Sequence, residues 1–191
     1  MNQIKRNFLY LELNNIKYFA TREPGGNIVS EKIREIILDK NNTSLTDECE
    51  ALLYASARAQ LLKEVIKPRL DNGELVICDR YIDSSIAYQG YARGLGVDFI
   101  ESINSSAIKN FMPDLTIFLD LPPIEAFKRK GGVDKNDRLE LSGIDFHNKV
   151  YEGYLELSKK YPNRIIKIDA SGSKEQTQEK IINALKANGI I

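Results

Sequence analysis

The sequence predicts an α/β fold in which helices cover both faces of a parallel sheet, giving three layers. Short apolar segments alternate along the chain with longer segments whose apolar residues recur every three or four positions. This alternation is typical of parallel strands joined by helical crossovers. Because 191 residues suit one domain, we expect residues 1–191 to fold as a single unit.

The first 38 residues predict a helix, a strand, a turn and a second helix. Apolar residues at helical spacing favour a helix over 2–13, and the pair Asn14-Asn15 is a plausible end for it. Residues 16–21 are short and β-prone. The Pro-Gly-Gly run at 24–26 requires a turn, after which the helical pattern resumes over 30–38.

The strongest helical pattern lies at 47–66. One apolar stripe is formed there by Leu52, Ala55, Ala59, Leu62 and Ile66. The remaining apolar runs and periodic segments predict strands at 75–79, 115–121 and 165–169, and helices at 82–91, 97–110, 123–130, 143–160 and 174–187.

Polar residues stand at the carboxyl ends of three predicted strands. Thr21, Asp79 and Asp120 occupy these positions. In open parallel sheets, ligands bind beyond the carboxyl ends of the strands. We therefore expect a binding site at this edge of the sheet.

Composition limits the classes of function. Lys plus Arg and Asp plus Glu both number 27, so the net charge is +0, which argues against nucleic-acid binding driven by overall charge. Cys49 and Cys78 lie in no metal-like spacing and suggest a reduced, cytoplasmic protein. Neither a signal peptide nor a long apolar run appears, so we expect no export and no membrane span.

The segment Arg22-Glu23-Pro24-Gly25-Gly26 follows the first predicted strand. The planar guanidinium of Arg22 suits a phosphate, and the glycines let the backbone pass close to a ligand. A surface turn with a solvated Arg–Glu pair is the alternative, and it is the more common reading of an isolated Pro-Gly-Gly.

Two pairs at i, i+4 spacing can each contact one object. Tyr54 and Arg58 combine a ring that can stack on a base with a guanidinium that can hydrogen-bond it; the alternative is a Tyr at the edge of the core beside an exposed Arg. Ser85 and Gln89 form the second pair, and a carboxamide matches the N3–H and a carbonyl of thymine or uracil. A plain polar helix face is the alternative there. Tyr88 can close the sugar side or simply pack.

Asp79-Arg80 ends a buried strand. The Asp79 carboxylate can hold a hydrated Mg²⁺ or accept from a phosphate-binding Arg, and Arg80 can neutralise a transferred phosphoryl group. A charged pair that merely caps the strand is the alternative. The basic, glycine-containing segment 128–143 is a candidate flap over a triphosphate, with Arg129 and Arg138 as phosphate contacts, or else a solvated loop.

Taken together, the strings at 21–26, 50–58, 79–94, 113–120 and 137–140 resemble the thymidylate kinase family, and the run Ala87–Gly94 is similar to its bacterial members. The resemblance implies the fold of the phosphate-loop nucleoside-monophosphate kinases and the phosphorylation of dTMP to dTDP with ATP and Mg²⁺. It also implies a homodimer. Around the phosphate of dTMP it implies Arg22, Arg34 and Arg80, and it adds Glu23 to the residues that bind dTMP. For the nucleoside it implies Tyr54, Arg58, Ser85, Tyr88 and Gln89. For catalysis it implies Asp79, Arg80 and Arg138, with Asp79 also near the metal. For the flap over ATP it implies Arg129 and Arg138.

The chain departs from this family in one respect. It contains no G-x-x-x-x-G-K-[ST], and it starts where the helix after that loop would already be running. We therefore expect the first, central strand of the sheet to be missing. Two further functions stay open: a non-catalytic dTMP-binding protein, and a related deoxynucleotide kinase.

Overall fold

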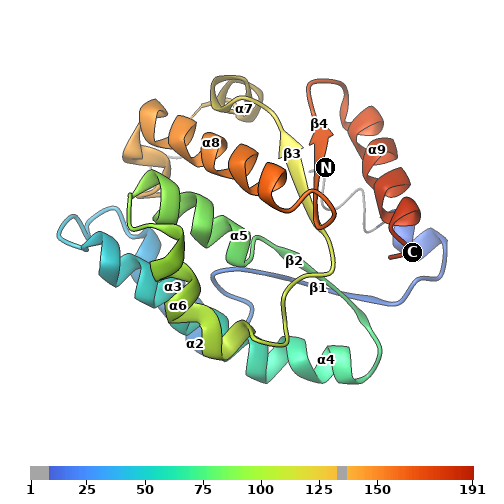
Figure 1. The fold of residues 1–191 in the computed structure, drawn as a ribbon, viewed down its shortest axis with the longest axis horizontal. Helices are drawn as coiled ribbons and strands as arrows, with labels where there is room; N and C mark the ends of the chain where they lie inside the picture. The colour runs from blue at the N-terminus through green and yellow to red at the C-terminus, as the bar shows by residue number, and fades with distance from the viewer. Residues whose placement is uncertain (1–8, 133–136) are drawn as a thin grey trace.

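The structure is a computed structural model that describes residues 9–132 and 137–191. It is a mixed α/β fold with short parallel strands (Figure 1). The strands are β1 (Tyr18–Arg22), β2 (Leu75–Asp79), β3 (Thr116–Asp120) and β4 (Ile165–Asp169). The longer helices are α2 (Ile28–Leu38), α3 (Asp47–Leu61), α6 (Val97–Ile108), α7 (Pro123–Lys130), α8 (Ile144–Lys160) and α9 (Lys174–Ala187). The short ones are the π-helical turns η1 (Leu62–Ile66) and η2 (Ile86–Ala92), the helices α4 (Lys67–Asp71) and α5 (Ile82–Ser85), and the 3₁₀ turn η3 (Glu140–Ser142).

The expected order of helices and strands is confirmed over the described residues. β2, β4, α7 and α9 have the predicted bounds. The helix expected at 47–66 is α3 followed directly by η1, and α4 continues it. Residues 9–13 are helical and end at the turn Asn14-Asn15, while the first part of the helix expected at 2–13 lies outside the described residues.

Side-chain caps account for where three helices begin. The Asn27 side chain accepts from the Ser30 N–H at 2.8 Å at the start of α2, and the Thr46 hydroxyl accepts from Cys49 at 3.3 Å at the start of α3. Ser173 and Gln176 form a reciprocal capping box on α9. Each cap satisfies backbone N–H groups that the first helical turn leaves without partners.

The buried stripe of α3 differs from the predicted one. Leu52 is 49% exposed and Ala59 is also exposed, whereas Ala51 and Arg58 are buried. The prediction was wrong here because it placed Arg58 to one side of the buried stripe. The structure instead buries the Arg58 guanidinium against the Glu23 carboxylate, so Arg58 belongs to the buried side of α3.

The four strands form two separate parallel pairs. β1 pairs with β2 in the register Tyr18↔Leu75 through Arg22↔Asp79, and β3 pairs with β4 from Thr116↔Ile165 onward. Among the described residues no strand joins β2 to β3. In Figure 1 the first pair runs across the view and the second runs up it. The expectation of parallel strands is confirmed, and the two pairs are not hydrogen-bonded to each other in the described residues.

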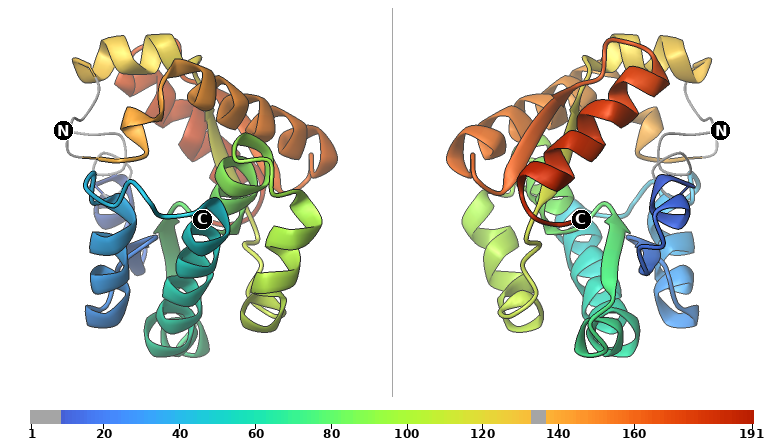
Figure 2. Two further views of the ribbon diagram at one scale, coloured as in Figure 1. Left: turned by 90° about the vertical axis from the view of Figure 1, so that its left-hand side faces the viewer. Right: turned by 90° about the vertical axis from the view of Figure 1, so that its right-hand side faces the viewer.

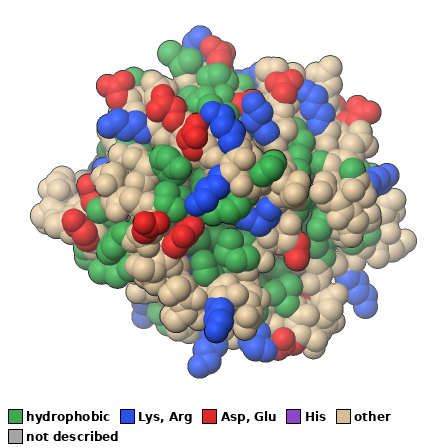
Figure 3. All heavy atoms as spheres, in the orientation of Figure 1, with side chains coloured by type: hydrophobic (Ala, Val, Ile, Leu, Met, Phe, Trp, Pro, Cys, Tyr) green, Lys and Arg blue, Asp and Glu red, His purple; other side chains and the backbone are tan. Residues whose placement is uncertain are grey.

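A cavity of about 730 Å³ lies between the two pairs. It is lined by all five residues of β2, by Thr116–Leu119 of β3, and by apolar side chains of α9 such as Ile181. Figure 2 shows the two halves that flank it: α2, α3 and α6 beside the first pair, and α7, α8 and α9 beside the second. On the face drawn in Figure 3, hydrophobic side chains gather near the centre with Lys and Arg side chains beside them.

The core holds the helices of the two halves together. α8 packs along η2, and buried Ala87, Val150 and Leu157 belong to the same cluster. The two elements approach closely at Gly153, where an added Cβ would lie 3.0 Å from the Cβ of Tyr91. In the part of the chain that the structure describes, no helix has the length and apolar character to cross a bilayer.

Candidate functional site

A narrow pocket lies just past the carboxyl ends of β1 and β2, where the strand order predicts a site. Its walls come from the turn after β1, from α3, from the turn after β2 and from the α5–η2 helix. The lining side chains are Glu23, Tyr54, Arg58, Arg80, Tyr81, Ser84, Ser85, Tyr88 and Gln89. The space inside holds little more than a water molecule. Most of the residues predicted for a nucleoside monophosphate therefore converge here, and a base would have to move side chains apart to enter.

Arg58 connects three walls of this pocket. Its side chain is only 1% exposed, and its Nε donates to Glu23 Oε2 at 2.9 Å. Nη1 donates to Asn104 Oδ1 at 2.7 Å, and Nη2 donates to Ser85 Oγ at 2.9 Å. Most of the guanidinium donors are thus used within the protein, so Arg58 is a structural centre of the pocket as well as part of its lining.

Glu23 is the charge partner of Arg58. Burial raises the pKa of the Glu23 carboxyl, and the nearby Arg58 guanidinium opposes that rise. The two groups lie 2.7 Å apart at their closest salt-bridge atoms, with side-chain exposures of 3% and 1%. A buried pair of this kind fixes the turn after β1 against α3, because losing either partner would leave a charge without compensation.

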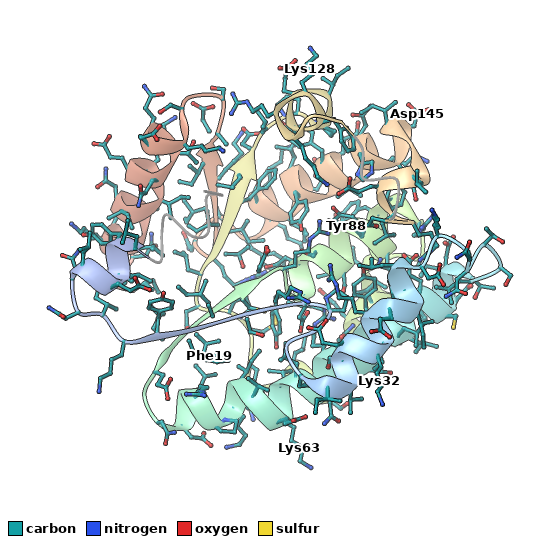
Figure 4. All side chains as sticks on the ribbon, turned by 180° about the vertical axis from the view of Figure 1, so that it is seen from behind. Phe19, Lys32, Lys63, Tyr88, Lys128 and Asp145 are labelled. Carbon is teal, nitrogen blue, oxygen red and sulfur yellow. The ribbon has the colours of Figure 1, made fainter. Side chains whose placement is uncertain are left out.

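Aromatic rings surround Arg80 at the other wall. Its guanidinium carbon lies 4.8 Å from the centre of the Tyr88 ring, which Figure 4 shows near the middle of the molecule. Arg80 has φ 67°, a left-handed conformation that a non-glycine residue rarely adopts. Burial raises the pKa of Tyr54, although the Arg80 charge acts against this, so the Tyr54 hydroxyl is protonated at neutral pH.

Glu50 lies behind the pocket and was not predicted as a site residue. Its carboxylate is 0% exposed and accepts from Gln89 Nε2 at 2.8 Å and from Arg93 Nη2 at 3.1 Å. Arg138 also donates to it. A signal was present in the sequence, because Glu50 lies four residues before Tyr54 and eight before Arg58, on one side of the helix.

Asn104 is the second residue that the sequence prediction missed. It is 1% exposed, and it stands in α6 four residues after Ile100 and four before Ile108, both buried. A polar residue in the middle of an apolar stripe must find a partner. The Nδ2 of Asn104 donates to the Ile100 carbonyl at 2.8 Å, which leaves Oδ1 to accept from Arg58.

Two of the arginines predicted to bind phosphate lie outside the pocket lining, at the turn after β1. Arg22 is half-exposed, and its Nη2 donates to both carboxylate oxygens of Glu31, at 2.9 and 2.8 Å. Arg34 donates to the Pro24 carbonyl at 3.0 Å, and burial followed by the Arg22 charge lowers its pKa. Arg34 therefore contacts the turn that carries Glu23 into the pocket, while Arg22 pairs with Glu31 of α2.

The arginines of the candidate flap contact protein groups. Arg129 donates to the carbonyls of Ala170 at 2.6 Å and Gly172 at 3.3 Å. Arg138 donates to the Ile37 carbonyl at 2.9 Å and to Glu50. Neither side chain belongs to the pocket lining. Within the flap predicted at 128–143, residues 133–136 lie outside the described residues.

Asp79 ends β2 with an exposed side chain that faces the large cavity. No side chain of residues 9–132 or 137–191 hydrogen-bonds its carboxylate. Mg²⁺ usually keeps several waters and uses only one or two carboxylates together with substrate phosphates. A single carboxylate such as that of Asp79 is compatible with this mode of binding. Among the described residues, no group of three His, Cys, Asp or Glu side chains comes together.

Comparison with known proteins identifies the family. The family model for thymidylate kinase matches residues 3–181. A thymidylate kinase of Clostridium novyi is 50% identical over 179 residues, which is 93% of this chain and 87% of the relative. One of Bacillus velezensis is 50% identical over 167 residues (86% and 79%), and one of Finegoldia magna is 44% identical over 188 residues (98% and 92%). The chain therefore belongs to the thymidylate kinase family.

Proposed function

We propose that this protein transfers a phosphoryl group from ATP to dTMP and so forms dTDP. The observation that carries the proposal is the pocket, because side chains from four separate segments converge on it beyond the carboxyl ends of β1 and β2. Family membership and relatives that are named thymidylate kinase support the choice of substrate.

The base would enter between α3 and the α5–η2 helix. Tyr54 would stack on the pyrimidine ring, since a flat aromatic surface gains free energy by covering a base. Ser85 accepts from Arg58, so its own hydroxyl hydrogen is available for a carbonyl of the base. Gln89 would meet the ring N–H, and Tyr88 would crowd the 2′ position of the sugar and favour deoxyribose.

The phosphate of dTMP would lie among guanidinium groups. Arg80 lines the pocket, whereas Arg22 precedes Glu23 in the chain and Arg34 contacts the carbonyl of Pro24, which follows it. A phosphate offers acceptor oxygens as the Glu31 carboxylate does, so the incoming anion would compete with Glu31 for Arg22.

Transfer would depend on charge neutralisation more than on covalent chemistry. A bound Mg²⁺ would supply positive charge that offsets the charge of the phosphates. Asp79 is the residue that would hold it, directly or through water. Arg80 would offset the charge that spreads over the transferred group. Arg129 and Arg138 would contact the phosphates of ATP only after leaving the carbonyl and carboxylate groups that they now bind.

A further parallel strand would fill the cavity between β2 and β3 and complete one sheet across a single domain. Two features support this: the cavity runs along the whole of β2, and its lining includes both strand edges together with apolar side chains. A glycine-rich loop after that strand would supply the N–H groups for ATP. We also propose cytoplasmic location and a homodimer, on family resemblance.

The strand proposal is tested by adding an N-terminal extension that carries an apolar strand followed by Gly-x-x-Gly-x-Gly-Lys-Thr. The extended protein should have a higher Tm than the 191-residue chain and should bind ATP in calorimetry. An unchanged Tm together with no ATP binding would refute the strand proposal.

The activity is tested by measuring dTDP formation from dTMP, ATP and Mg²⁺ in the extended protein. Replacing Arg80 by Ala should lower kcat by about 100-fold or more, since one lost charge contact in a transition state costs about that much. Arg69→Ala is the matched control, because Arg69 lies over Phe19 and pairs with Glu74, away from the pocket. Near-normal turnover in Arg80→Ala would contradict the assignment of Arg80.

A further inference from the structure

Glu50 contacts the one carboxamide in the pocket. Its Oε1 accepts from Gln89 Nε2 at 2.8 Å, and both side chains are at most 1% exposed. The other oxygen of Glu50 accepts from Arg93 at 3.1 Å and from Arg138. Glu50 forms salt bridges with Arg93 and Arg138, and carboxylate oxygens can only accept hydrogen bonds.

This contact decides which way the Gln89 amide is turned. A carboxylate oxygen at 2.8 Å requires an N–H opposite it, so the NH₂ end of Gln89 faces Glu50. Turning the amide by 180° would bring two acceptor oxygens together in a buried place, which is costly. Among residues 9–132 and 137–191, no donor is hydrogen-bonded to Gln89 Oε1, and Gln89 lines the pocket.

We infer that Glu50 is a positioning residue that sets the base preference of the pocket. By holding the NH₂ end of Gln89, it keeps an acceptor, Oε1, available to the ligand. Thymine and uracil present N3–H, a donor, whereas cytosine presents a bare N3, an acceptor. Glu50 therefore selects for 4-oxo-pyrimidine monophosphates and against dCMP. This inference rests on the proposed function, because it requires that the pocket binds the base.

The competing role for Glu50 is purely structural. Its carboxylate links α3 to Arg93 at the end of η2 and to Arg138 in the second part of the candidate flap, so it also connects three segments. Replacing a residue that only links segments would change the affinity for dTMP and for dCMP by the same factor. A residue that fixes the amide of Gln89 would change the ratio between ligands, and that ratio separates the two roles.

The test is calorimetric titration of the protein with dTMP and with dCMP. Unmodified protein should bind dCMP about 10- to 100-fold more weakly than dTMP, as expected for one buried acceptor facing another. In Glu50→Gln the new carboxamide can donate to Gln89, so Gln89 can turn over. The ratio should then fall at least about tenfold, mainly through tighter dCMP binding. An unchanged ratio overturns the inference.

Asp47→Asn is the matched control. Asp47 is on the same helix and pairs with the same Arg93 at 3.2 Å, but it does not contact Gln89. It loses the same charge by the same chemical change, and its ratio should stay that of the unmodified protein. If the affinity ratio of Asp47→Asn falls as much as that of Glu50→Gln, the effect comes from charge alone, and the inference is overturned.

Gln89→Leu separates failure of this inference from failure of the proposed function. If Gln89→Leu no longer discriminates dTMP from dCMP but Glu50→Gln still does, only the role of Glu50 is rejected. Full discrimination in Gln89→Leu rejects the base pocket itself. Should Glu50→Gln not fold, the side-chain NH₂ signals of Gln89 in unmodified protein decide by NMR. They should be protected from solvent exchange in the free and the dTMP-bound states, and rapid exchange in the free protein overturns the inference.

Discussion

Replacement of Arg58 by Ala should destabilise the protein by several kcal/mol. The side chain is 1% exposed and hydrogen-bonds Glu23, Asn104 and Ser85 at 2.7–2.9 Å. Truncation leaves the Glu23 carboxylate buried without its counter-charge. Removing one partner of a buried pair costs about 3–5 kcal/mol. This is a large part of the roughly 5–15 kcal/mol that stabilises a typical domain.

Urea denaturation followed by circular dichroism measures the loss. The midpoint should fall without a change in slope, because the surface exposed on unfolding stays nearly the same. Arg69→Ala is again the control: its salt bridge to Glu74 is 3.3 Å long and partly exposed, so the change should be about 1 kcal/mol or less.

A double variant checks the cause. Arg58→Met combined with Glu23→Leu removes both charges and fills much of the same volume, so it should be more stable than Arg58→Ala by about 2 kcal/mol or more. Destabilisation of Arg58→Ala by less than about 1 kcal/mol would refute the reasoning, because the buried charge would then cost almost nothing.

Three further outcomes are expected. Gly26→Ala should cost about 2–4 kcal/mol, since φ is +85° and the new Cβ would lie 2.3 Å from the Thr21 hydroxyl; an unchanged Tm would contradict this. N-ethylmaleimide at pH 8 should modify exposed Cys49 and spare Cys78, whose pKa burial raises; mass spectrometry of the labelled peptides reads this out, and equal labelling would be the contrary result. A hydrogen bond to Asp120 raises the pKa of Tyr151 to about 12. The stability that this hydrogen bond contributes is therefore complete below pH 10 and is lost as pH rises through about 12. The stability of Tyr151→Phe should decline less over this pH range than that of the unmodified protein, and an identical decline would rule the contribution out.

Much of the fold could be predicted from periodicity alone. The apolar runs of β2 and β4 and the turns beside them fixed those strands at their observed bounds. The π-helical turns η1 and η2 could not be predicted, because they add a residue to a helical turn without any change in composition. Periodicity did not predict the gap between β2 and β3 either, since spacing along the chain does not state which strands are neighbours; the expectation of a missing central strand came from the family resemblance.

Pocket residues could be predicted from the sequence where two of them lie one helical turn apart. Tyr54, Ser85 and Gln89 were found because i, i+4 spacing places side chains on one face. Glu50 and Asn104 were missed because their partners are 39 and 46 residues away, on other elements. A charged or polar residue on an apolar stripe signals a buried partner, but the sequence does not say which one.

The most direct test of the account is an NMR titration of folded protein with dTMP. We expect saturable shifts centred on Tyr54, Ser85 and Gln89, with dCMP producing weaker shifts at the same residues. A folded sample in which excess dTMP leaves these three signals unmoved would contradict the account.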